Sequence, residues 1–186
     1  TNAGGVGLCG AFGNNGGNIN LLCGTGSLGI DLSQLIIAPT VAYKFNANHS
    51  IGISPLLGYQ RFTAYGLQGF GGLSSNAANL TNRGYDDSFG YGVRVGYYGQ
   101  LSDSFSIGAA YASKMNMQKF DKYKGLFAEQ GGFDLPENYN IGVSFKATPS
   151  LFFALDYQHI SYSGIKSVSN PSTNTGLLGT DNGRGF

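Results

Sequence analysis

Apolar and polar residues alternate with a period of two along several stretches of the chain. In each stretch the odd-numbered positions carry large apolar side chains, and the even-numbered positions carry mostly glycine, serine or alanine. Successive side chains of a β-strand point to opposite faces, so this pattern predicts strands with one apolar face and one small, polar face. The predicted strands are 35–45, 51–59, 89–101, 105–111, 139–145 and 151–157, with a weaker seventh at 5–12.

The connections between these strands fall into two classes. Short polar turns are expected at 46–49, 102–104 and 147–150, and long loops at about 13–31, 66–88, 115–135 and 163–186. Turns and loops alternate along the chain, so antiparallel strands would place the turns at one end of the sheet and the loops at the other. Outer-membrane barrels have this arrangement, with periplasmic turns and extracellular loops.

The composition favours a membrane barrel over an ordinary soluble domain. Only 11% of the residues are charged, against about 25% in typical globular proteins. Glycine accounts for 31 residues, and Tyr and Phe contribute 12 and 13. No apolar run is long enough for a transmembrane helix, whereas barrel strands need only every second residue to be apolar. A soluble β-sandwich rich in glycine is the alternative, in which the odd-numbered side chains would face a second sheet.

Closure of the barrel constrains the size of the complete protein. Seven strands would leave two unpaired edges inside lipid, where each unsatisfied amide is costly, and bacterial single-chain barrels have even strand numbers. The first residues also lack the basic start and apolar core of a signal peptide, although an outer-membrane protein must be exported. We therefore expect residues 1–186 to form one partial barrel domain, with further sequence missing.

No pattern in the chain predicts an enzyme. The net charge of +1 gives no basis for a nucleic-acid partner. The match of 5–10 to G-x-G-x-x-G does not open a helix, and such matches arise by chance in a chain this rich in glycine. His49 and His159 lack nearby nucleophiles or metal ligands. We expect no catalytic residues, no cofactor and no metal site.

The two cysteines, Cys9 and Cys23, flank a polar stretch rich in glycine and asparagine. An exported protein reaches an oxidising compartment, where a disulfide that closes this loop would persist. We expect the disulfide to form, with two free thiols as the alternative.

Two of the predicted loops carry apolar side chains that are costly to expose to water. These are Leu67, Phe70 and Leu73 in the first loop, and Phe120, Leu126 and Phe127 in the second. Three lysines, Lys119, Lys122 and Lys124, are interleaved with the second set. The loops are expected to meet as a hydrophobic binding groove, with the lysines attracting an anionic head group. Alternatively, the loops only cap the barrel, and the lysines contact lipopolysaccharide phosphate or solvent.

Several segments resemble the FadL/TodX family of outer-membrane long-chain fatty-acid transport proteins. They are 29–34, 37–44, 59–62, 119–123, 133–139 and 181–183. The resemblance covers nearly the whole chain and consists of many moderate matches. It implies an all-β fold, an antiparallel transmembrane β-barrel of about 14 strands, within the range of outer-membrane barrels. The chain resembles the third to ninth strands, without the N-terminal hatch, the first strands and the last strands.

The same resemblance implies a channel in the bacterial outer membrane for passive uptake of hydrophobic compounds. Fatty acids or aromatic hydrocarbons are the expected substrates, and outer-membrane lipid and lipopolysaccharide are the expected surroundings of a monomeric barrel. In the family, the two loops named above correspond to the pair that forms an outer hydrophobic groove. The cysteine pair is not part of the family's pattern. A structural or adhesive surface barrel without transport is the alternative function.

Overall fold

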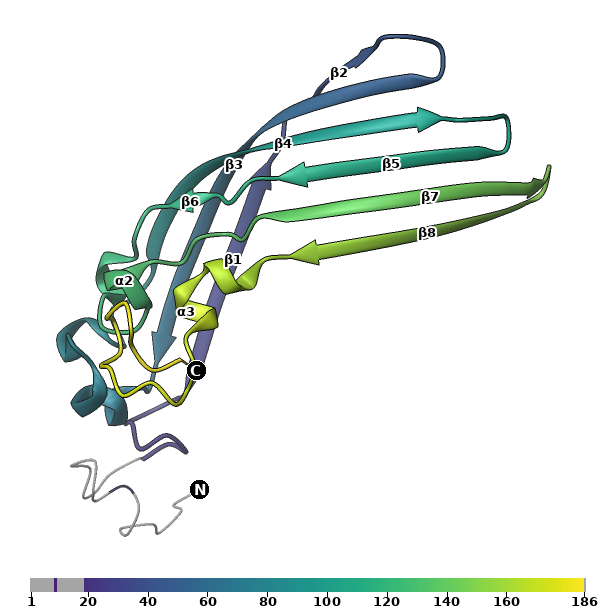
Figure 1. Ribbon diagram of the computed structural model, residues 1–186. Helices are drawn as coiled ribbons and strands as arrows, with labels where there is room; N and C mark the ends of the chain where they lie inside the picture. Colours follow the sequence, from purple (N-terminus) through teal and green to yellow (C-terminus); the bar gives the residue numbers. More distant parts are fainter. Residues whose placement is uncertain (1–8, 10–18, 186) are drawn as a thin grey trace.

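The computed structural model describes Cys9 and residues 19–185, and it consists of one curled antiparallel sheet with the long loops gathered at one end (Figure 1). The sheet has eight strands in the order β1-β3-β4-β5-β7-β8, with β2 also paired to β3 and β6 to β4. The strands are β1 (Gly29–Ile37), β2 (Val41–Lys44), β3 (His49–Tyr65), β4 (Asp86–Gln100), β5 (Phe105–Ala112), β6 (Asn116–Met117), β7 (Asn138–Thr148) and β8 (Leu151–Ile160).

Between residues 19 and 185, the short helices lie in the long connections. They are η2 (Gln68–Leu73), η3 (Ala77–Asn79), η4 (Asp121–Tyr123), α2 (Ala128–Gly131), η5 (Tyr162–Gly164) and α3 (Lys166–Ser169). None of the helices in the described part of the chain is both long enough and apolar enough to span a membrane. The short connections after β2, β4 and β7 lie at the opposite end of the sheet (Figure 1). The predicted separation of turns from loops is confirmed.

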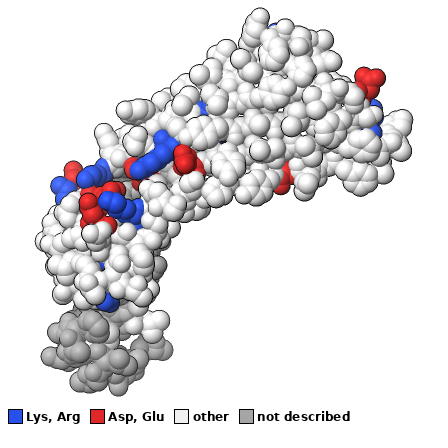
Figure 2. Space-filling view, in the orientation of Figure 1, with Lys and Arg blue, Asp and Glu red and all other residues white. Residues whose placement is uncertain are grey.

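The strand registers place the odd-numbered residues together on one face. A single row of paired residues crosses the sheet from Val41 through Ile53, Val95, Tyr111 and Tyr139. Large apolar side chains remain exposed along this face, which we call the outer face, and Tyr91 and Leu155 are 71% and 72% exposed. In the view of Figure 2, most Lys, Arg, Asp and Glu side chains lie toward the loop end, and most of the surface along the strands is uncharged. An uncharged apolar wall of this size is stable only when something other than water covers it.

The even-numbered residues form the inner face, against which chain segments from the loop end fold. Gly, Ser and Ala occupy much of it, as the alternation predicted, although β1 carries Ile30, Leu32 and Ile36 on this side. Along β3 the even-numbered residues are buried from Ser54 to Ala64, and most of the odd-numbered residues are exposed. The buried face of the sheet is therefore the face predicted to carry small side chains.

Two strand predictions are wrong in detail. The stretch 35–45 was predicted as one strand, but it divides into β1 and β2, because residues 38–40 leave the ladder around Pro39. Proline has no N–H to donate, which interrupts pairing at that position. β1 also begins earlier than predicted, and β3 extends to Tyr65. The weak strand predicted at 5–12 lies outside the described residues.

A β-bulge interrupts the wall where β5 gives way to β6. Ala112 pairs with Arg94, whereas Asn116 pairs with Tyr91, so the β5–β6 segment has one residue more than the stretch of β4 that faces it. A one-residue shift of register turns the following side chains to the other face. Met117 therefore lies against Gly90 on the inner face, although its number is odd.

Candidate ligand site at the loop end

An apolar cluster, here called the loop cluster, fills the space between the loops and the inner face of β3. It combines residues from β3, from both predicted loops and from the C-terminal segment. Its members are Phe62, Ala64, Leu67, Leu80, Phe120, Tyr123, Leu126, Phe127 and Leu178, with Phe70 and Phe133 packed against them. Phe62 is its aromatic centre, because the ring centroids of Phe120, Tyr123 and Phe127 lie 5.6, 4.8 and 4.7 Å from that of Phe62.

Tyr123 fixes the second loop to the end of β3 by hydrogen bonds from a buried side chain. Its hydroxyl accepts from the backbone N–H of Ala64 at 3.1 Å and donates to the carbonyl of Gly84 at 2.7 Å. The hydroxyl also lies 3.1 Å from Thr63 Oγ1. A buried phenol needs such partners, and here they join η4, β3 and the first loop. Sequence reasoning missed this residue.

The structure brings the two predicted loops together. Leu67, Phe120, Leu126 and Phe127 are buried in the loop cluster, where they pack against one another and against Phe62. Phe70 and Leu73 instead line a pocket of about 90 Å³ beside the cluster. Leu177, Leu178 and Arg184 complete this pocket, which shows that the C-terminal segment belongs to the site. The sequence offered no signal for that long-range contact.

The three predicted lysines lie at the loop end of the molecule and differ in their surroundings. Lys119 is exposed. The ammonium of Lys122 donates to the carbonyl of Tyr85, and Lys124 forms an ion pair with Asp121 at 2.9 Å. The cation in the lining of the small pocket is Arg184.

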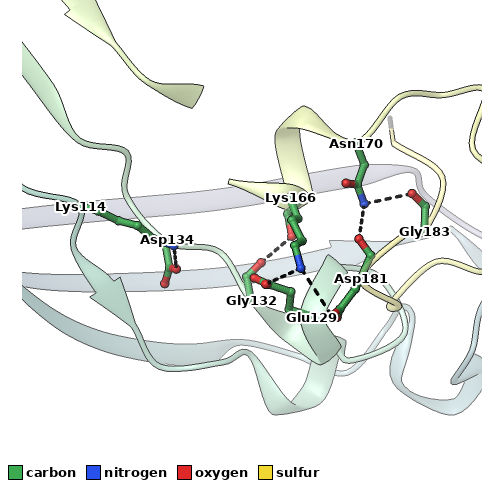
Figure 3. Close-up of polar contacts among 9 residues, drawn as sticks. Lys114, Glu129, Gly132, Asp134, Lys166, Asn170, Asp181 and Gly183 are labelled. Carbon is green, nitrogen blue, oxygen red and sulfur yellow. Dashed lines mark hydrogen bonds and ion pairs between the residues drawn. The ribbon is translucent and has the colours of Figure 1, made fainter. Parts of the chain in front are cut away.

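A polar network ties the second loop to the C-terminal segment (Figure 3). The ammonium of Lys166 lies 3.1 Å from Glu129 and 3.5 Å from Asp181. The hydrogen bond to Glu129 raises the pKa of Lys166 above its ordinary value, with Asp181 adding to the effect. A second ion pair joins Lys114 and Asp134 at 2.7 Å. These contacts order the loops around the cluster.

The second apolar cluster, here called the inner cluster, lies on the inner face further from the loop end. It consists of Leu56, Ala112, Met115 and Met117, with Ala38 and Leu135 packed against it. The two methionines stand over glycines of β3 and β4. A Cβ built on Gly92 would lie 2.8 Å from Met115 Cγ, and one on Gly58 would lie 2.7 Å from Met115 Cε. The small residues of the inner face therefore leave room for side chains of the same chain to pack against the sheet.

Cys9 and Cys23 are joined by a disulfide in the structure, with Cα atoms 5.1 Å apart. The bridge closes the polar stretch that precedes β1. Cys23 lies next to the site, because its backbone carbonyl carbon would stand 3.1 Å from a Cβ built on Gly69 of η2.

The curled antiparallel sheet, its separated turns and loops and its apolar outer wall define the class of the protein as an outer-membrane β-barrel. Solved structures with the same fold include the Ralstonia pickettii toluene transporter TbuX, which is 17% identical with a TM-score of 0.57. The Pseudomonas putida toluene transporter TodX is 15% identical with a TM-score of 0.53, and the CymD monoaromatic hydrocarbon channel is 18% identical with a TM-score of 0.54. No curated protein sequence matches the chain.

The matched regions cover 81%, 74% and 76% of this chain for TbuX, TodX and CymD, and 48%, 44% and 50% of those structures. The chain thus spans about half the length of these relatives. The family model of the outer membrane protein transport proteins (OMPP1/FadL/TodX) matches residues 20–183. The chain belongs to this family of Gram-negative outer-membrane transport proteins, as the resemblance indicated.

Proposed function

We propose that the full-length protein containing this chain is an outer-membrane channel for passive uptake of hydrophobic compounds, such as aromatic hydrocarbons or long-chain fatty acids. The observation that carries the proposal is the loop cluster with the small apolar pocket at its edge. Family membership supports transport, and the solved relatives are described as toluene transporters and a monoaromatic hydrocarbon channel.

Binding at such a site would be driven by burial of apolar surface, at about 25 cal/mol per Å². Phe70 and Leu73 would receive the ligand, because they line the pocket, while the buried residues of the loop cluster would support them. Neither an energy source nor a cofactor is needed when a compound moves down its own concentration gradient. The loop cluster would thus act as a preformed apolar platform at the mouth of the channel.

The lysines would attract anionic groups to this platform. Lys119 is exposed, so it would attract a fatty-acid carboxylate or a lipopolysaccharide phosphate only weakly, and salt would screen the attraction. Lys122 and Lys124 would contribute less, because each already has a partner in the loops. We propose that the barrel is a monomer surrounded by outer-membrane lipid and lipopolysaccharide.

The proposal is tested by uptake of radiolabelled toluene and of a long-chain fatty acid into Gram-negative cells that lack their own transporter of this family. Phe70→Ser and Leu73→Ser in the full-length protein should reduce uptake several-fold while the barrel stays folded, as judged by heat-modifiable gel mobility. Val168→Ser is the matched control, because it also removes a partly exposed apolar side chain from a loop, away from the pocket.

Phe120 and Phe127 are less suitable positions for this test. They are 0% and 8% exposed in the loop cluster, and emptying such a position costs about 3–5 kcal/mol of local stability. If wild-type protein gives no uptake above empty cells, transport is excluded and an adhesive or structural surface barrel becomes the better interpretation. If uptake occurs but Phe70→Ser and Leu73→Ser behave like Val168→Ser, the small pocket is not on the route.

A further inference from the structure

The side chain of Gln60 is fully buried, and neither its amide nitrogen nor its amide oxygen has a hydrogen-bond partner. Within the described part of the chain it is the only buried side chain with polar atoms in this state. A buried amide without partners destabilises the folded protein, so its retention calls for an explanation. An apolar side chain of similar size would fill the same space without that cost.

Gln60 lies on the inner face of β3 between the two apolar clusters. The next inner-face residue toward the loops is Phe62, the aromatic centre of the loop cluster. The next one in the other direction is Gly58, which lies beneath Met115 and Met117 of the inner cluster. A polar amide is thus held between two apolar surfaces that share one side of the wall.

The neighbouring strands place polar residues beside Gln60 but do not satisfy its amide. Its Cα partners are Gln34 on β1 and Ser88 on β4. The Ser88 hydroxyl is also fully buried, and it donates to the carbonyl of Gln118 at 2.6 Å. Gln34 is exposed. A primary amide can donate two hydrogen bonds and accept two, and all of this capacity remains available at Gln60.

We propose that Gln60 binds the hydroxyl or carboxyl group of a permeating compound whose apolar body lies against the two clusters. This inference rests on the proposed function and adds to it a preference among hydrophobic substrates. Two methionines and one aromatic ring flank the site, and methionine side chains are unbranched and rearrange at little cost. A compound could displace them, place its apolar part where they packed and give the amide its missing partner.

The experiment compares two probes that differ by one hydroxyl group, toluene and p-cresol, in cells that express the full-length protein. Gln60→Leu should lower the ratio of p-cresol uptake to toluene uptake about three- to tenfold, the value of one hydrogen bond. Gln158→Leu is the matched control. It removes an exposed amide from the inner face on β8, away from both clusters, and should leave the ratio of the two uptakes unchanged.

The stability of the purified variant gives a second, independent measurement. Gln60→Leu should unfold at a temperature no lower than wild type, because it replaces an unpartnered amide by an apolar group. A clear decrease would show that the amide has a structural partner in the full-length protein and would overturn the proposal. Gln60→Met offers a second apolar side chain if Gln60→Leu does not fold.

The outcomes separate this inference from the function on which it rests. If wild-type protein transports toluene but Gln60→Leu changes both uptakes in the same proportion, or changes neither, Gln60 does not bind the polar group and channel function stands. If wild-type protein transports neither compound, both the channel function and the role of Gln60 are rejected.

Discussion

The glycines on the inner face of β4 differ in how much space a side chain would find at each position. A Cβ built on Gly92 would lie 2.8 Å from Met115 Cγ and 3.1 Å from Ser113 Oγ, so a side chain there would push against the bulge. A Cβ built on Gly96, on the same strand and face, would meet no heavy atom closer than 3.7 Å. The absence of a side chain is therefore required at Gly92 and not at Gly96.

Gly92→Ala should lower the free energy of unfolding by about 1–3 kcal/mol, the usual cost of overpacking a filled site. Gly96→Ala should be neutral or slightly stabilising, because glycine weakens the interior of a strand. The unfolding midpoint in urea, followed by heat-modifiable gel mobility, measures both. Equal effects at the two positions would mean that Met115 does not pack on Gly92 in the membrane.

Residues of the candidate site could be selected from the sequence when their polarity differed from that of their neighbours in the chain. Phe120, Leu126 and Phe127 were selected because apolar side chains in a polar loop must be buried somewhere, and they are. Tyr123 was missed, since tyrosine is unremarkable in a loop and its partners come from β3 and from Gly84. Gln60 was missed because its burial depends on chain segments far away in the sequence.

At the scale of the elements, alternation identified most of the strands in the described part of the chain but not their interruptions. The break at Pro39 was visible in the sequence as a residue without an N–H, yet the apolar alternation continues through it and conceals it. The bulge between β5 and β6 was not visible. After the bulge the odd-numbered residues face inward, as the contact of Met117 with Gly90 shows.

The bond between Cys9 and Cys23 should contribute to the stability of the exported protein. We predict that both cysteines are oxidised in the exported protein and that reduction lowers stability by about 3 kcal/mol, the chain-entropy estimate for a loop of this size. The separation of the two cysteines is 14 residues. Alkylation without reductant followed by mass spectrometry tests the pairing directly. Two alkylated thiols would refute the bond.

At the scale of the whole molecule, the two faces of the sheet differ in what covers them. The loop cluster and the inner cluster cover part of the inner face, so the side chains of both clusters are buried within the chain. The outer face keeps its large apolar side chains exposed. The period of two predicted this difference from the sequence alone. Which segments cover the inner face was not predictable, because each cluster joins residues from distant parts of the chain.

This difference between the faces predicts that the outer face meets lipid. Val143, in the middle of β7, shares the outer face with Ile107 and Leu155, whereas Ser144 lies on the inner face in a hollow that also contains Asp156. Val143→Arg should cost about 2–4 kcal/mol in the full-length barrel, the price of a charged side chain near the bilayer midplane. Ser144→Arg should cost much less, because its guanidinium can reach water and the Asp156 carboxylate. Reversible unfolding in lipid vesicles measures both variants. If Ser144→Arg costs as much as Val143→Arg or more, the outer face is not the face that meets lipid.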